Sequence, residues 1–111
     1  MENLLKLLAK KHVKEILQYL DTHGEVHFGQ LHKDLNIHKG TLGNILDELV
    51  ESEILNKRRE ETDALLPKTY YSLTNFGKRV LMVYKLCNAL KKEDDTPIKI
   101  IYGDKVIASS Y

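Results

Sequence analysis

The sequence predicts one α+β domain that is mainly helical. The chain has 111 residues, which is the size of a single compact domain. Apolar residues recur with helical spacing along most of the first half and again after position 74. Between these stretches lie two short segments whose β-branched, aromatic and alternating residues are typical of strands. We therefore expect a helical core with a strand pair inserted before the last helix.

The composition indicates a folded chain and excludes several classes of protein. Hydrophobic residues make up 42% of the chain and charged residues 30%, which is too apolar for a disordered protein. No stretch approaches the roughly 18 consecutive apolar residues of a membrane span, so we expect a soluble, cytoplasmic protein that binds no membrane. Cys87 is the only cysteine, which excludes an internal disulfide and a cysteine-based zinc site.

The first helix is expected as one continuous segment from Leu4 to Leu20. At about 100° per residue, Leu4 and Leu8 point almost opposite to the mean direction of the later apolar residues Val13, Ile16, Leu17 and Leu20, so this helix would contact two different surfaces. The run Asp21–Gly24 ends the helix, because glycine readily adopts the left-handed conformation found at helix C-termini.

Two shorter helices joined by a tight turn are predicted next. After an extended segment over residues 25–27, Phe28–Leu35 has the spacing of an amphipathic helix, and Asn36 ends it. A short turn follows, and a third helix runs from about Lys39 to Glu51. This helix buries one apolar stripe, formed by Leu42, Ile45, Leu46, Leu49 and Val50.

A hairpin and a long helix follow the third helix. Ile54–Arg59 and Lys68–Leu73 are predicted to form two strands, and the first of them ends in three consecutive basic residues. Thr74 is a suitable N-cap for a last helix that extends to about Lys92. Cys87 lies on the inner of two apolar stripes of this helix, so we expect it to be a small core residue.

The C-terminal tail is predicted to be a second hairpin. Ile98–Ser109 contains two strand-like runs around Gly103-Asp104, a dipeptide suited to a type II′ turn. We divide the chain into a domain of residues 1–92, which includes N- and C-terminal dimerisation helices, and a hairpin extension of residues 93–111. The tail is too apolar to be solvated, so it must dock on its own chain or on a partner.

Surplus apolar surface favours a homodimer. The last helix carries two apolar stripes, and Leu4 and Leu8 oppose the face used by the rest of the first helix. One core does not accommodate all of them, whereas two chains packed about a two-fold axis would.

The predicted order of helix, helix, tight turn, helix, basic hairpin and long helix is that of a winged helix-turn-helix domain. Residues 35–55, LNIHKGTLGNILDELVESEIL, resemble the L-x-I-x-x-x-T-[VL]-x-x-x-L-x-x-L-x-x-x-G-[LI]-[LI] core of the MarR, HxlR and PadR-like transcriptional regulators. Residues 71–77, YSLTNFG, are similar to the Y-x-L-T-x-x-G signature with which those families leave the wing. The resemblance implies a DNA-binding transcriptional regulator.

Glu53 departs from this family pattern. The families usually place a helix-terminating glycine at this position. Glu53 must therefore adopt a left-handed backbone at some cost, or the third helix must end in a different way.

The exposed start of the third helix is the predicted base-reading element. A helix fits the major groove, and its N-terminal residues approach base edges when its opposite stripe is buried. The candidates are Lys39, Gly40, Thr41, Gly43 and Asn44. The glycines permit close approach to DNA, although Gly43 is equally suited to close packing on the preceding helix. Asn44 has the donor and acceptor needed to pair with adenine, or it is an ordinary solvated residue.

Basic residues of the hairpin are predicted to contact phosphates. Alternation along the strand lets two of the three consecutive basic residues face one side, and a lysine lies across the hairpin. The predicted phosphate contacts are Lys57, Arg58, Arg59 and Lys68. Glu60, Glu61 and Asp63 near the loop tip would repel the DNA backbone, so we expect contact at the base of the strands.

Other functions are also compatible with the sequence. A winged-helix protein-interaction module without sequence-specific DNA binding is favoured by the net charge of +1 and by acidic residues late in the third helix. A ligand-gated sensor with a small-molecule effector is a third interpretation. Five histidines suggest a metal sensor, but their spacing matches no ligand set, so no metal or other cofactor is predicted. We find no catalytic motif and expect no enzyme.

Overall fold

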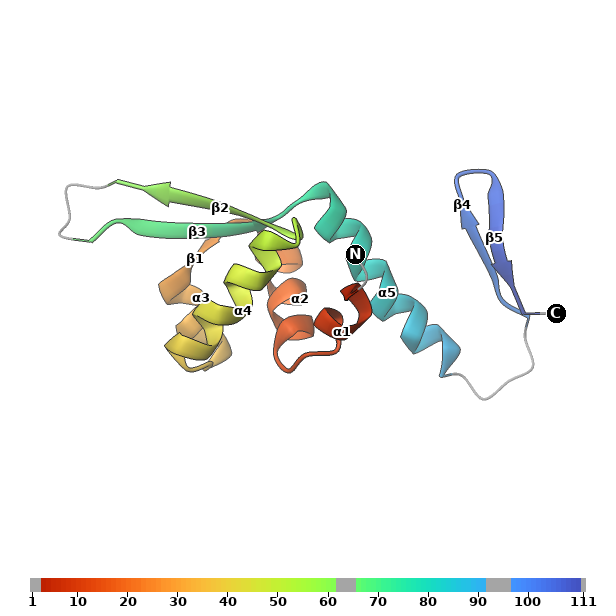
Figure 1. The fold of residues 1–111 in the computed structure, drawn as a ribbon, viewed down its shortest axis with the longest axis horizontal. Coiled ribbons are helices and arrows are strands. Elements are labelled where there is room, and N and C mark those ends of the chain that lie inside the picture. Colours follow the sequence, from red (N-terminus) through yellow and green to blue (C-terminus); the bar gives the residue numbers. More distant parts are fainter. Residues whose placement is uncertain (1–2, 62–65, 92–96, 111) are drawn as a thin grey trace.

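A computed structural model describes residues 3–61, 66–91 and 97–110 (Figure 1). The molecule is elongated, 59 × 27 × 25 Å, with a strand pair projecting at one end and a separate hairpin at the other. In chain order the elements are α1 (Leu4–Leu8), α2 (Val13–His23), β1 (Val26–His27), α3 (Phe28–Leu35), α4 (Lys39–Glu51), β2 (Leu55–Glu60), β3 (Lys68–Leu73), α5 (Asn75–Leu90), β4 (Lys99–Tyr102) and β5 (Lys105–Ser109).

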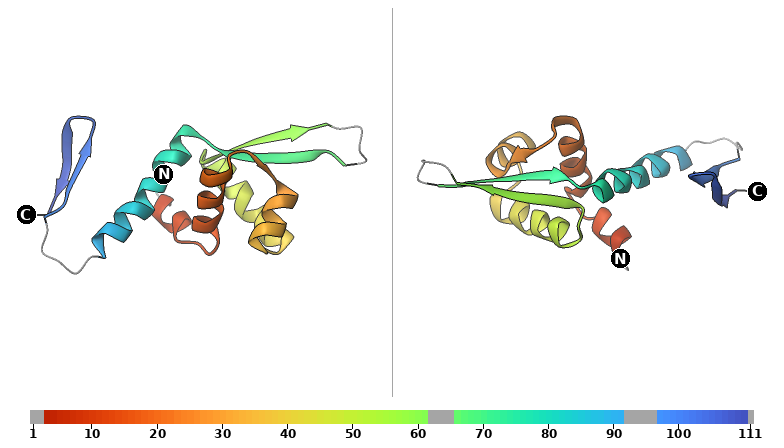
Figure 2. Two further views of the ribbon diagram at one scale, coloured as in Figure 1. Left: turned by 180° about the vertical axis from the view of Figure 1, so that it is seen from behind. Right: turned by 90° about the horizontal axis from the view of Figure 1, so that it is seen from above.

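The sheet beside the helices is antiparallel, with the strand order β1-β3-β2 (Figure 2). β2 and β3 pair along their whole length and form the wing. β1 has two residues, Val26 and His27, which pair with Tyr71 and Tyr70 of β3. This short strand joins the segment between α2 and α3 directly to the wing.

One apolar core holds α2, α3, α4 and one face of the sheet together. The predicted stripe of α4 faces this core through three fully buried leucines, with Ile45 and Val50 at its margin. The largest fully buried side chains are Val13, Ile16, Leu17, Leu20, Leu31, Ile37, Leu42, Leu46, Leu49 and Ile54. The amphipathic spacing therefore predicted the buried faces of the central helices correctly.

The N-terminal helix is broken, so the prediction of one helix over Leu4–Leu20 is wrong. α1 ends at Leu8 and α2 begins at Val13, and His12 between them has a left-handed backbone with φ of 74°. The break reorients α1, so that Leu8 joins the core and is only 5% exposed. Leu8 therefore does not belong to the surplus apolar surface from which the sequence predicted a dimer.

α4 ends in a Schellman motif. The N–H of Ile54 donates to the carbonyl of Leu49 at 3.0 Å, and the N–H of Glu53 donates to that of Val50 at 3.0 Å. Glu53 has a φ of 62°, the left-handed conformation for which glycine is favoured. The sequence left open whether Glu53 adopts a left-handed backbone or α4 ends in a different way. The structure shows the left-handed backbone at Glu53.

Replacing Glu53 with glycine is expected to stabilise the protein by up to about 1 kcal/mol. A side chain with left-handed φ costs about 1–2 kcal/mol, and the added chain entropy of glycine offsets part of that gain. Urea unfolding measures the change. Glu51→Gly is the control, because Glu51 is helical and its replacement should destabilise by roughly 0.5–1 kcal/mol. Equal effects of the two substitutions would contradict the explanation.

Thr74 and Gly77, from the YSLTNFG segment, fix the start of α5. The hydroxyl of Thr74 accepts the N–H of Gly77 at 2.8 Å and donates to the carbonyl of Glu53 at 2.7 Å. A Cβ added to Gly77 would lie 2.2 Å from the carbonyl oxygen of Ile54. The missing side chain thus lets α5 contact the backbone that links α4 to β2.

The second half of α5 extends beyond the core. Val80 and Leu81 are buried, whereas Met82 and Leu90 are each 57% exposed. Cys87 is also exposed, so its prediction as a core residue is wrong, because the helix has left the core at this point. Neither α5 nor any other helix of the described residues is long and apolar enough to cross a membrane.

β4 and β5 form the predicted C-terminal hairpin. They pair antiparallel, and Gly103 in the turn has a φ of 66°, as the first central residue of a type II′ turn requires. Ile101, Tyr102, Val106 and Ile107 are 49–66% exposed. The hairpin therefore does not fold back to bury its apolar side chains on its own chain.

Candidate DNA-binding surface

The turn between α3 and α4 sets the angle at which α4 is presented. Asn36 ends α3 with a left-handed backbone, φ 53°, and Ile37 is buried with 2% exposure. The ring Nδ1–H of His32 donates to the carbonyl of Ile37 at 2.7 Å and closes the turn. Side-chain and backbone contacts therefore hold the two helices in a defined orientation.

The first two turns of α4 carry the predicted base-reading residues on the outside of the molecule. Lys39, Gly40, Thr41 and Asn44 are exposed, and Gly43 is partly exposed. A Cβ added to Gly43 would meet nothing within 4 Å, so close packing against α3 does not explain this glycine. The structure thus brings these five residues together at one exposed helix end.

Both helices of the helix-turn-helix begin with the same His-x-Gly pattern. His27 precedes α3 and His38 precedes α4, and a Cβ on the glycine two residues later would lie 3.3 Å from the imidazole ring in each case. Nδ1 of His27 accepts the N–H of Gln30 at 3.3 Å, whereas His38 makes no such bond. The first N–H groups of α4 therefore lack a side-chain cap and are available to a phosphate oxygen. This repeated His-x-Gly pattern is visible in the sequence but was not predicted to have a role there.

The basic wing residues divide between the two faces of the strand pair. Lys57 lies opposite Tyr71, which faces the core, and Arg59 lies on the same face because side chains alternate along a strand. Arg58 and Lys68 lie on the other face. Two of the consecutive cations therefore share one side, as predicted, but Lys68 does not lie with them.

The guanidinium of Arg58 already forms ion pairs with other side chains of this protein. Its guanidinium donates to the carboxylate of Glu25 at 2.6 and 3.1 Å and to that of Glu60 at 3.2 Å. It also lies 4.5 Å from the ring centroid of Tyr70. The hydrogen bonds from Arg58 hold the pKa of Glu25 below its usual value, and those carboxylates raise the pKa of Arg58. Glu25 is thirty-three positions away in the sequence, and no local signal indicates this pair.

The acidic residues beside the wing loop pair with the wing arginines. Glu60 contacts Arg58, and the carboxylate of Glu61 lies 3.4 Å from Nε of Arg59. Asp63 lies outside the described residues. Within the described chain neither Lys57 nor Lys68 forms an ion pair, so these two strand cations are more directly available to a phosphate than Arg58 and Arg59.

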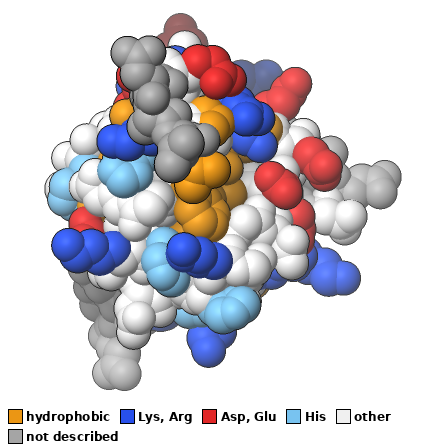
Figure 3. Space-filling view, turned by 90° about the vertical axis from the view of Figure 1, so that its left-hand side faces the viewer, with side chains coloured by type: hydrophobic (Ala, Val, Ile, Leu, Met, Phe, Trp, Pro, Cys, Tyr) orange, Lys and Arg blue, Asp and Glu red, His pale blue; other side chains and the backbone are white. Residues whose placement is uncertain are grey.

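Figure 3 shows the end of the molecule that carries the wing, where Lys and His side chains lie on one side of a small apolar strip and Asp and Glu side chains lie on the other. A hollow of about 420 Å³ lies between the wing and the start of α3, and Phe28, Pro67 and Tyr71 are among its lining residues. In the described part of the chain, no three His, Cys, Asp or Glu side chains gather as a metal site requires. The cations and the apolar strip together form a surface of the kind that DNA contacts.

A tight turn between two helices, an exposed start of the second helix and a strand pair with basic residues define a winged helix-turn-helix DNA-binding domain. Residues 15–64 match the sequence model of the MarR family. An uncharacterized HTH-type transcriptional regulator of Methanocaldococcus jannaschii is 42% identical over 83 residues, which cover 75% of this chain and 77% of that protein. The chain belongs to the winged helix-turn-helix transcriptional regulators.

The chain is also similar to a further relative and to solved structures of transcriptional regulators. An uncharacterized protein of Methanocaldococcus jannaschii is 43% identical over 103 residues, covering 90% of this chain and 86% of that protein. The reduced form of the transcriptional regulator YodB from B. subtilis matches with a TM-score of 0.67 and 26% identity, over 80% of this chain and 85% of that chain. The transcriptional repressor BigR from Xylella fastidiosa matches with a TM-score of 0.59 and 27% identity, over 84% and 88%. The predicted fold and the predicted regulator function are confirmed.

Proposed function

We propose that this regulator binds DNA as a homodimer in the cytoplasm, with the start of α4 in the major groove and the wing on flanking phosphates. This proposal rests on the exposure of the first two turns of α4. They combine two glycines, uncapped N–H groups and the side chains of Lys39, Thr41 and Asn44. Such a helix end approaches base edges and phosphates without steric obstruction. We propose no catalytic role, since the fold and the family are those of transcriptional regulators.

Salt-dependent binding to the DNA upstream of its own gene tests this function. Phosphate contacts release counterions, so affinity should fall steeply as salt rises. Lys57→Ala and Arg59→Ala should each flatten the salt slope by about 0.9 for a lost phosphate contact. Lys11→Ala, at an exposed position between α1 and α2, is the control and should leave the slope unchanged. Absence of salt-sensitive binding to any duplex would instead favour the protein-interaction module.

The pair between Glu25 and Arg58 leads to a prediction about affinity. Glu25 occupies the donors with which Arg58 would hold a phosphate. Glu25→Gln is therefore expected to strengthen binding to all duplexes by roughly two- to tenfold at low salt, because it frees the arginine and removes a negative charge. Fluorescence anisotropy with a labelled duplex measures the change.

Two controls separate these causes. Asp21→Asn makes the same charge change at an exposed position of α2 and should alter affinity less. In a chain that already carries Arg58→Ala, the Glu25 substitution should lose most of its effect. If Glu25→Gln raised the DNA affinity equally in chains with and without Arg58, the ion pair between Glu25 and Arg58 would not limit DNA binding.

The homodimer rests on exposed apolar side chains of α1 and α5, which lie away from the wing. Leu5 of α1 is 72% exposed, and Met82 and Leu90 of α5 are each 57% exposed. Packing about a two-fold axis would bury them and leave both wings free. Sedimentation at micromolar concentration tests the dimer, and a monomer would end this part of the proposal. The DNA site is then expected to be palindromic, with half-sites separated by whole helical turns.

A further inference from the structure

Two surfaces away from the DNA-binding end have complementary chemistry. The first is the β4–β5 hairpin, whose large apolar side chains are exposed. The second is a hollow of about 590 Å³ between α1 and the end of α4, which we call the α1–α4 hollow. Its lining includes Leu4, Leu7, Glu48, Glu51 and Glu53.

The hairpin carries apolar side chains on both faces. Ile101 and Val106 are paired and share one face, with Lys99 on the same side by alternation. Tyr102 and Lys105 are paired on the other face. A strand pair with one face in water shows its apolar residues on the opposite face alone. This hairpin therefore fits between two surfaces, and each of its faces brings one lysine.

The α1–α4 hollow has an apolar floor and an acidic rim. Leu4 packs against the core and Leu7 is 7% exposed. The Nζ atom of Lys10 forms an ion pair with the carboxylate of Glu48 at 2.8 Å. Glu51 and Glu53 form no ion pair with any other described residue. Two carboxylates are therefore available to a segment that is both apolar and cationic.

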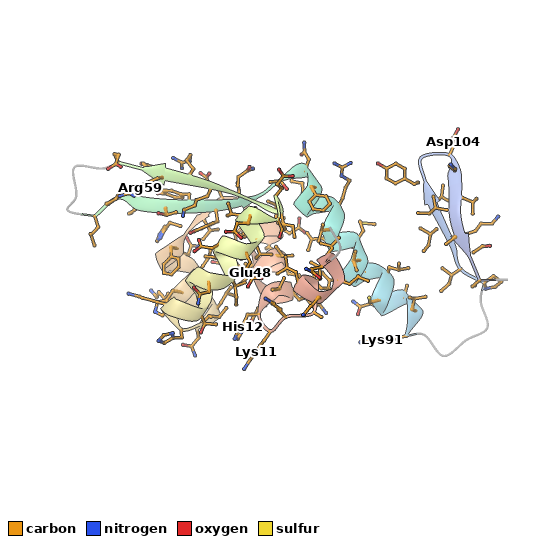
Figure 4. All side chains as sticks on the ribbon, in the orientation of Figure 1. Lys11, His12, Glu48, Arg59, Lys91 and Asp104 are labelled. Carbon is orange, nitrogen blue, oxygen red and sulfur yellow. The ribbon has the colours of Figure 1, made fainter. Side chains whose placement is uncertain are left out.

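We propose that the β4–β5 hairpin of one chain docks in the α1–α4 hollow of a second copy, and that the second copy docks its hairpin in return. Figure 4 shows Asp104 at the hairpin tip, well away from Glu48 beside the hollow of the same chain. The hairpin lies beyond the end of α5 and projects away from its own core (Figure 1). A reciprocal exchange is the contact that a two-fold axis generates.

This arrangement rests on the proposed homodimer and accounts for both faces of the hairpin. One face meets the floor and the carboxylates of the hollow. The other face covers exposed apolar side chains of α5, among them Met82 and Leu90. The wing and the start of α4 lie at the other end of the molecule and stay open to DNA.

Charge reversal with mixing tests the exchange. The arm variant carries Lys99→Glu and Lys105→Glu, so that the lysine is reversed on whichever face of the hairpin enters the hollow. The hollow variant carries Glu51→Lys and Glu53→Lys. Each variant opposes like charges in its own homodimer, so its dimer Kd should rise by about tenfold or more. In an equimolar mixture both contacts join opposite charges, and heterodimers should form with a Kd within about threefold of the wild type. Sedimentation velocity at micromolar concentration measures the dimer Kd of the arm variant, of the hollow variant and of their mixture.

The controls keep the result interpretable. Lys11→Glu with Lys78→Glu makes the same charge change as the arm variant at exposed positions elsewhere and should leave the dimer intact. Thermal melts show that each variant is folded. Homodimers of either variant as tight as the wild type would overturn the proposal.

A mixture that stays monomeric would also overturn it, because joining opposite charges would then have failed to restore the contact. Salt-sensitive DNA binding by the same proteins keeps the regulator function separate from this inference. A monomeric wild type that binds DNA would overturn both the exchange and the homodimer but not DNA binding.

Discussion

Gly77→Ala is expected to destabilise the protein by about 3 kcal/mol, because an inserted methyl group that the backbone must accommodate costs roughly 1–3 kcal/mol and the adjacent cap adds to it. The new Cβ would lie 2.2 Å from the Ile54 carbonyl oxygen, which belongs to the backbone and has little freedom to move. Its displacement would also disturb the hydrogen bonds of Thr74. Thermal unfolding should show a midpoint lower by at least about 10 °C.

Gly43→Ala is the matched control for that substitution. Gly43 also lies in a helix, but a Cβ there meets nothing within 4 Å. Alanine should therefore stabilise the protein by up to about 1 kcal/mol through its higher helix propensity. The same substitution is expected to weaken DNA binding, because it adds a methyl group to the proposed groove-facing surface. If Gly77→Ala were as harmless to folding as Gly43→Ala, the close approach of α5 would not explain the glycine.

Asn44→Ala is expected to weaken binding to the preferred DNA site by about 1–3 kcal/mol, or roughly 5- to 150-fold, and to leave binding to unrelated duplexes almost unchanged. Asn44 is exposed on the second turn of α4, one turn after the uncapped start of the helix. An amide there can read a base edge, whereas it adds no charge to attract phosphates. Competition between specific and random duplexes measures the ratio.

Asn88→Ala provides the comparison, since Asn88 is also an exposed helical asparagine but lies in the part of α5 beyond the core. It should not change either affinity. A loss at Asn44 that is equal for all duplexes would assign this residue to the backbone contacts rather than to base reading.

Local patterns predicted most of the fold. The stripe from Leu42 to Val50 and the cap at Thr74 are signals within one element, and both elements begin at the predicted residues. The break before α2 was not predictable in this way, because no glycine or proline lies between Leu8 and Val13. The left-handed His12 is selected by the burial of α1 against the rest of the chain, which periodicity does not describe.

The candidate site was predictable in its position but not in its electrostatics. Residue types and spacing indicated the exposed start of α4 and the cations of β2. The sequence did not indicate that Glu25 holds Arg58, because tertiary folding brings them together. The exposure of Cys87 was missed for a related reason. Spacing shows that a helix has an apolar stripe, but it does not show how far along the helix the core extends.

The pairing of β1 with β3 has a mechanical consequence. This two-residue strand, reinforced by the contact of Glu25 with Arg58, ties the entrance of α3 to the middle of the wing. These contacts restrain the wing relative to α3, so we expect the wing and the helix-turn-helix to move together. In a homodimer of such units, a signal received near α5 would change DNA affinity by altering the spacing and angle between two undeformed bodies.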